Sequence, residues 1–188
     1  MAETHPLRVI SICGSLRKGS FNAALQRVLP ELAPAGMRIE AISGIGDIPL
    51  YNADVQANGF PKPVTDVADT IRKADGVIIC SPEYNYSIPG VLKNAIDWLS
   101  RLKDQPFAGK PILLQSASGG ALGGARMQYH LRQVMVFVEA LTFNRPEVFV
   151  GAAPTKFDAD LKLTDQASRD IIKQQLAGFE AFIRRVGK

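Results

Sequence analysis

The chain has 188 residues, of which 46% are hydrophobic and 21% charged, and its formal net charge is +4. This composition is ordinary for a globular protein and predicts one domain, residues 1–188, large enough for a full core. The cations are dispersed, which argues against nucleic acid as the main partner. No apolar run reaches the roughly 18 residues of a membrane span, and Met1–Pro6 lacks the apolar stretch of a signal peptide. We therefore expect a cytoplasmic protein with no membrane partner.

The two cysteines, Cys13 and Cys80, each end an apolar run. Such positions are typical of small buried hydrophobic residues in a reducing compartment. Together with His5 and His130 they show no ligand spacing, so the sequence predicts no metal site.

Strand and helix patterns alternate along the whole chain. Short apolar runs predict strands, and apolar residues at a spacing of three or four predict helices. The strands are expected at 7–13, 37–42, 76–80, 111–116 and 148–150. The first, second and last helices have apolar stripes within 21–32, 64–71 and 172–186, the third helix starts near Pro89–Gly90, and the fourth runs from about Gly124 to Ala140. The stretch 43–63 is rich in Gly, Pro, Asn and Asp and is predicted to be irregular.

This alternation, without a repeat or a linker, predicts an α/β fold with a parallel sheet covered by helices on both faces. Five strands favour the order 2-1-3-4-5, the flavodoxin-like arrangement. Its switch point lies between strands one and three, and ligands bind there at the carboxyl ends of the strands. The loops after the first, third and fourth strands are therefore the candidate site.

The first of these loops, 14–22, has a composition suited to an anion, with two glycines, two serines and two cations. Ser20 or Asn22 can cap the helix that follows, which leaves free N–H groups and the positive end of the dipole facing the loop. The Arg17 guanidinium and the hydroxyls complete a site suited to a phosphate monoester. The alternative is an ordinary strand-to-helix turn with a capping serine and two solvated cations.

Two other phosphate motifs are excluded in this loop. Gly14 and Gly19 have the P-loop spacing, but Ser20-Phe21 stands where Lys followed by Ser or Thr is required. Leu16 occupies the second glycine position of the dinucleotide fingerprint. A single phosphate, as in a mononucleotide, fits better.

The second loop, 81–90, contains two prolines, two tyrosines and an asparagine. It can offer backbone groups to the edge of a planar heterocycle while Tyr84 or Tyr86 contacts a ring. The alternative is a proline-stiffened turn whose tyrosines cover the core.

The third loop, 116–126, contains four glycines, which let backbone approach a ligand closely. N–H groups there can stabilise negative charge on a reduced ring; the alternative is plain loop flexibility. An anion cradle, a polar aromatic wall and a wall of backbone donors at one sheet edge together describe a site for a phosphate and a flat heterocycle, as in flavin mononucleotide (FMN).

Two segments resemble the NAD(P)H-dependent FMN reductase family and, within it, the bacterial quinone and chromate reductases. They are 14–22, GSLRKGSFN, and 82–98, PEYNYSIPGVLKNAIDW. The second motif is long and specific, the third loop is a looser match, and the likeness spans nearly the whole chain.

The resemblance implies a flavodoxin-like fold that binds FMN tightly and takes NAD(P)H as co-substrate. By position, the first loop would hold the phosphate, the second would line the isoalloxazine, and the third would close its other side. The implied cofactor-binding residues are Ser15, Leu16, Arg17, Ser20, Phe21, Asn22, Pro82, Glu83, Tyr84, Asn85, Ser116, Ser118 and Gly119. The resemblance also implies a homodimer or homotetramer with the flavin near a subunit boundary, as is general in the family.

The implied reaction consists of two half-reactions at one site. NAD(P)H passes a hydride to flavin N5, the oxidised nicotinamide leaves, and an acceptor takes its place, which is a ping-pong mechanism. Because the flavin performs the chemistry, we name no catalytic acid, base or nucleophile. The sequence leaves the acceptor open among quinones, free flavin, azo dyes and metal oxyanions such as chromate.

Arg126 lies near the start of a predicted helix, where the helix dipole disfavours a cation. We hypothesise that an anion holds it, either a carboxylate of a neighbouring subunit or a phosphate of the nicotinamide nucleotide; the alternative is a solvated arginine.

The same helix is apolar on more than one side, which favours either a subunit interface or a deeply buried helix. Its apolar residues are Tyr129, Leu131, Val134, Met135, Phe137 and Val138.

Three other functions compete with the reductase. A non-catalytic flavodoxin-type electron carrier usually has a strongly acidic surface, and the net charge of +4 points away from it. A phosphate-binding hydrolase needs a nucleophile or metal carboxylates near the switch point, and Glu83 alone is not enough. A scaffold protein would show no turnover of NAD(P)H with a quinone.

Overall fold

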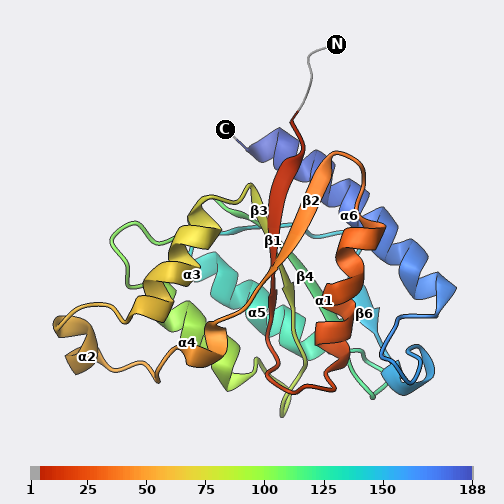
Figure 1. Ribbon diagram of the computed structural model, residues 1–188, viewed down its shortest axis with the longest axis horizontal. Helices are drawn as coiled ribbons and strands as arrows, with labels where there is room; N and C mark the ends of the chain where they lie inside the picture. The colour runs from red at the N-terminus through yellow and green to blue at the C-terminus, as the bar shows by residue number, and fades with distance from the viewer. Residues whose placement is uncertain (1–4, 188) are drawn as a thin grey trace.

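The computed structural model describes residues 5–187; Met1–Thr4, on which part of the expectation about a signal peptide rests, lie outside them. Strands and helices alternate (Figure 1). The strands are β1 (Leu7–Cys13), β2 (Met37–Ile42), β3 (Gly76–Cys80), β4 (Pro111–Ala117), β5 (Leu141–Thr142) and β6 (Val148–Val150). The helices are α1 (Phe21–Leu32), α2 (Ala53–Ala57), α3 (Lys62–Arg72), α4 (Gly90–Leu99), α5 (Ala125–Phe137) and α6 (Gln166–Val186), with 3-10 turns η1 (Ile45–Asp47) and η2 (Ala153–Thr155).

The sheet is parallel and has the order β2-β1-β3-β4-β5, which confirms the predicted flavodoxin-like arrangement. Two short strands share the place beside β4. β5 pairs with the start of β4 at Pro111 and Ile112, and β6 pairs with its end from Gln115 to Ala117. β5 has only two residues and therefore no hydrophobic periodicity, so the sequence does not predict it.

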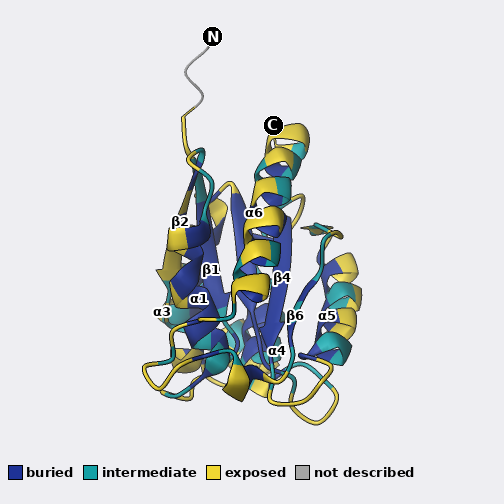
Figure 2. Cartoon of the chain, turned by 90° about the vertical axis from the view of Figure 1, so that its right-hand side faces the viewer, coloured by how far each residue is buried: buried dark blue, intermediate teal, exposed yellow. Residues whose placement is uncertain are grey.

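Alternate residues of the strands enter two separate cores, one on each face of the sheet. In β3, which is buried throughout, Val77 and Ile79 pack in the core under α3, α4 and α5. Ile78 and Cys80 pack in the core under α1 and α6. Figure 2 shows the buried strands between helices whose outer faces are exposed. The predicted covering of both faces is therefore confirmed, and it follows from the two-residue period of a strand.

The stretch 43–63 was predicted to be irregular, and this was wrong in part because it contains η1 and α2. Helix α2 begins after Asn52, whose side chain accepts a hydrogen bond of 2.8 Å from the N–H of Asp54. None of its five residues is buried, so it leaves no apolar stripe in the sequence. The stretch is tied to α4, where Asn94 Nδ2 and Trp98 Nε1 each donate to the carbonyl of Pro49 over 2.9 Å.

None of the helices within residues 5–187 is both long and apolar enough to cross a membrane. The same residues hold no group of three or more His, Cys, Asp or Glu side chains arranged to bind a metal ion.

Candidate flavin site

The loops after β1, β3 and β4 lie together at one edge of the sheet, the lower edge in Figure 1. They enclose a cavity of about 280 Å³. Its lining residues are Ser15, Arg17, Ser20, Phe21, Asn22, Pro82, Glu83, Tyr84, Ala117, Ser118 and Gly119. All of the expected cofactor-binding residues except Leu16, Asn85 and Ser116 are among them, and Ala117 is an addition. The three loops therefore line one cavity.

The first loop ends at the capped N-terminus of α1. Of the two capping candidates, Ser20 is the cap, and its Oγ accepts from the N–H groups of Asn22 at 3.2 Å and Ala23 at 3.3 Å. Arg17 is exposed, and none of the ion pairs within residues 5–187 involves it. A guanidinium without an acidic partner beside the positive end of a helix forms a site for an anion.

Asn22 joins the first loop to the third. Its side chain is buried, Nδ2 donates to the carbonyl of Ala117 at 2.9 Å, and Oδ1 accepts from the N–H of Ala117 at 2.8 Å. Both polar ends of the amide are thus used by one residue at the end of β4. This pair of hydrogen bonds fixes the distance between the two loops.

The second loop makes a tight turn from Tyr84 to Ser87, whose backbones exchange hydrogen bonds of 3.1 and 3.0 Å. Asn85 and Tyr86 between them have φ of +48° and +68°, as in a type I′ turn. The turn places the Tyr84 hydroxyl 3.5 Å from Ser15 Oγ, at the cavity, and leaves Asn85 exposed at its tip. Leu16, from the first loop, is exposed and lies against Gly46 of η1 instead of lining the cavity.

In the third loop, Ser116 is fully buried behind the cavity wall. Its Oγ accepts a hydrogen bond of 2.8 Å from Gln128 Nε2, which also donates to the carbonyl of Val148. Gln128 therefore fastens α5 to β4 and β6. Ser118 lies on the cavity side, and its Oγ accepts from the N–H of Gly120 at 3.2 Å.

Arg126 has an anionic partner, and that partner lies within the same chain; a carboxylate of a neighbouring subunit and a phosphate of the nicotinamide nucleotide stay predictions. Nε and Nη2 of Arg126 each lie 2.5 Å from Oε1 of Glu83 in the same chain. The hydrogen bond to Glu83 raises the pKa of Arg126 above its usual value. The sequence did not show this pair because the two residues are 43 positions apart and meet only through the fold.

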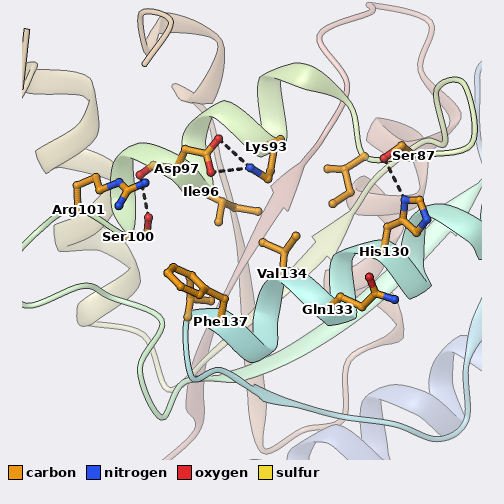
Figure 3. Close-up of a pocket in the computed structure, with 12 residues that line it drawn as sticks. Ser87, Lys93, Ile96, Asp97, Ser100, Arg101, His130, Gln133, Val134 and Phe137 are labelled. Atoms are coloured by element: carbon orange, nitrogen blue, oxygen red, sulfur yellow. Dashed lines mark hydrogen bonds and ion pairs between the residues drawn. The ribbon is translucent and has the colours of Figure 1, made fainter. Parts of the chain in front are cut away.

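Helix α5 is buried on one side only, so the alternative of a deeply buried helix is wrong. Leu131 and Met135 are fully buried, whereas Val136 and Phe137 are 77% and 76% exposed. Between α5 and α4 lies a second cavity of about 540 Å³, which the sequence analysis did not foresee (Figure 3). In it Ser87 Oγ lies 3.1 Å from His130 Nδ1.

The two cysteines are neighbours across the register of β1 and β3. Burial raises the pKa of Cys13 and raises that of Cys80 well above its usual value. Both thiols are therefore held in the protonated, weakly nucleophilic form, in agreement with their expected role as small apolar residues.

Comparison with known proteins matches residues 7–155 to the family model of NADPH-dependent FMN reductases. The chain belongs to this family. A quinone reductase of Escherichia coli strain K12 is 55% identical over 182 residues, which are 96% of this chain and 97% of that protein. An NAD(P)H-dependent FMN reductase of Pseudomonas aeruginosa is 48% identical over 180 residues, with 96% and 97% covered. The solved structure of FerB, a flavoenzyme NAD(P)H:(acceptor) oxidoreductase from Paracoccus denitrificans, superimposes with a TM-score of 0.87 at 33% identity and covers 97% of this chain and 100% of its own.

The protein is therefore an oxidoreductase that uses FMN as cofactor and NAD(P)H as co-substrate. The donor set of the cavity fits FMN. A free guanidinium and a capped helix N-terminus suit the phosphate, and walls of backbone, proline and tyrosine suit a flat ring.

The two hydrogen bonds of the Asn22 amide should contribute measurably to the stability of the protein. Asn22→Ala leaves both backbone groups of Ala117 without a partner at a buried position, so we expect the free energy of unfolding to fall by about 1–3 kcal/mol in urea denaturation. Asn58→Ala is the control because its exposed amide makes one hydrogen bond, to the carbonyl of Asp54. We expect that variant to stay within about 0.5 kcal/mol of the wild type. Equal losses in the two variants would contradict the role given to Asn22.

Proposed function

We propose that this enzyme passes a hydride from NAD(P)H, by way of bound FMN, to quinones in a ping-pong cycle. The observation that carries the proposal is the meeting of three loops around one cavity, with an anion site at one end and flat walls beside it. When bound, FMN supplies the redox chemistry, taking up the hydride at N5 and giving it to the acceptor. The residues of the chain bind the flavin and orient it and the substrates.

At the phosphate end, Arg17 supplies a charge-assisted hydrogen bond to the anion. Ser20 Oγ already accepts two backbone N–H groups, so its own proton is available to donate into the cavity. Ser15, Phe21 and Asn22 complete this end. Pro82, Glu83 and Tyr84 of the second loop would hold one side of the ring, with Asn85 at the tip of the same turn, and Ser118 and Gly119 would close the other, with Ser116 behind them.

One site serves both substrates in turn. Tyr84 is 49% exposed at the rim of the cavity, where a planar nicotinamide or quinone can stack beside the flavin. A hydride added to a quinone leaves a hydroquinone anion, which takes its proton from water. A metal oxyanion such as chromate, which accepts electrons and takes its protons from water, is a second acceptor to test. The relatives include a quinone reductase, which supports quinones as the first class to try. Because NAD(P)H is made and used inside cells, we propose a cytoplasmic enzyme.

The test of this function is turnover by the dialysed, yellow protein. NADPH added without oxygen should bleach the flavin, and a benzoquinone added next should restore the colour. Initial rates at several concentrations of both substrates should give parallel double-reciprocal lines. Bleaching without turnover of the quinone would contradict the proposal and favour an electron carrier, and intersecting lines would rule out the ping-pong order.

We expect Arg17 to contribute to the affinity of the protein for FMN. Arg17→Ala removes a charge-assisted contact of roughly 1.5–3 kcal/mol, so the Kd for FMN should rise about 10- to 150-fold. Flavin fluorescence quenching by the apoprotein measures it. The control is Lys18→Ala, which removes the neighbouring cation, a residue that does not line the cavity. Equal affinities in the two variants would show that Arg17 does not hold the phosphate.

We also propose that the enzyme is a homodimer or homotetramer in which the exposed face of α5 meets a second copy. Val136 and Phe137 lie side by side on this face, and the cavity beside them has an apolar floor of Ile96 and Val134 (Figure 3). Neighbouring large apolar side chains exposed to water are typical of an interface.

Phe137→Glu should therefore lower the molar mass measured by light scattering to that of a smaller assembly. Leu50→Glu is the control, since Leu50 is 84% exposed on a different segment and should leave the mass unchanged. A monomeric wild type, or a Phe137→Glu variant of unchanged mass, would contradict the interface.

A further inference from the structure

Glu83 lines the cavity, yet its carboxylate turns away from it to the start of α5. The side chain is 7% exposed; Oε1 meets Arg126 and Oε2 accepts from the N–H of Met127 at 3.3 Å. A carboxylate facing the cavity would repel the electron-rich ring of a reduced flavin. Pairing with Arg126 directs the Glu83 carboxylate away from the cavity and balances its negative charge.

The same carboxylate completes the N-terminus of α5. Gly124 is the residue before the first helical turn, and having no side chain it makes no capping hydrogen bond. Glu83 supplies the missing acceptor from another loop, and its negative charge lies at the positive end of the helix dipole. This explains why the cation Arg126 is tolerated in the first turn.

Arg126 also holds the strained part of the second loop. Its Cζ lies 3.6 Å from the centroid of the Tyr86 ring, a cation–π contact. Tyr86 has a φ of +68°, a strained conformation for a non-glycine residue that persists only where its surroundings hold it. Ser87, the next residue, is held to α5 by His130. The loop is thus fastened to α5 by Glu83, Tyr86 and Ser87.

We propose that Glu83 and Arg126 are a positioning pair that fixes the second loop beside the flavin. Through their balanced charges, the two residues also set the reduction potential of the flavin. This inference rests on the proposed placement of FMN in the cavity. Reduction adds electrons to the ring, so a nearby positive charge favours the reduced form and a negative one opposes it. Removing one partner leaves the charge of the other unbalanced at the edge of the site.

The test is the midpoint potential of bound FMN, measured by equilibration with a reference dye. Glu83→Gln leaves the Arg126 charge and should raise the potential, whereas Arg126→Met leaves the Glu83 charge and should lower it. The double variant should return close to the wild type. Arg126→Lys keeps the charge and should keep the potential.

The controls are Lys62→Met and Asp66→Asn, which break an exposed ion pair on α3 and should leave the potential unchanged. Shifts of the same sign in Glu83→Gln and Arg126→Met, or none, would overturn the inference, because a purely structural pair moves FMN affinity without opposite electrostatic effects. If either Glu83→Gln or Arg126→Met does not fold, the midpoint potential of the other variant is compared with that of Arg126→Lys. A shift of the expected sign supports the inference, and no shift overturns it. A wild type that takes up no FMN would instead overturn the proposed function, and this inference with it.

Discussion

The parallel register of β1, β3 and β4 is the constraint on which the site depends. Cys13 pairs with Cys80, and Cys80 pairs with Gln115, so these residues of the three central strands lie in one row across the sheet. Each strand then leaves the sheet within two residues of that row, in the same direction. Three loops that are far apart in the sequence consequently start side by side, and the cavity between them requires no further element to bring them together.

Loops at the edge of a sheet have little apolar core of their own, and polar side chains fix them to one another here. Asn22 ties the first loop to the third through two hydrogen bonds to Ala117. Glu83 ties the second loop to the start of α5, and Gln128 ties α5 to Ser116 and Val148. The side chains of Asn22 and Gln128 are buried and that of Glu83 is nearly so, which makes each of them costly to leave unpaired. The frame is therefore held by contacts within the chain itself, which favours tight binding of a cofactor.

The parts of the fold that the sequence predicted are those with a strong local pattern. The apolar runs at 7–13 and 76–80 form buried strands, and the stripe from Ile172 to Val186 forms α6. The two-residue strand β5 and the exposed helix α2 carry no such pattern. Loop composition likewise identified most of the cavity lining. It did not show that Ser116 faces Gln128, or that Arg126 meets Glu83, because those contacts depend on how α5 packs against the sheet.

A crystal structure of the protein grown with FMN would show whether the three loops form one FMN site. We expect the phosphate beside Arg17 and the N-terminus of α1, with the isoalloxazine between Pro82–Asn85 and Ala117–Gly119. We also expect the Glu83–Arg126 pair to remain closed behind the second loop. Flavin bound elsewhere, for example in the larger cavity between α4 and α5, would show that the three loops are not the FMN site, however active the enzyme proved to be.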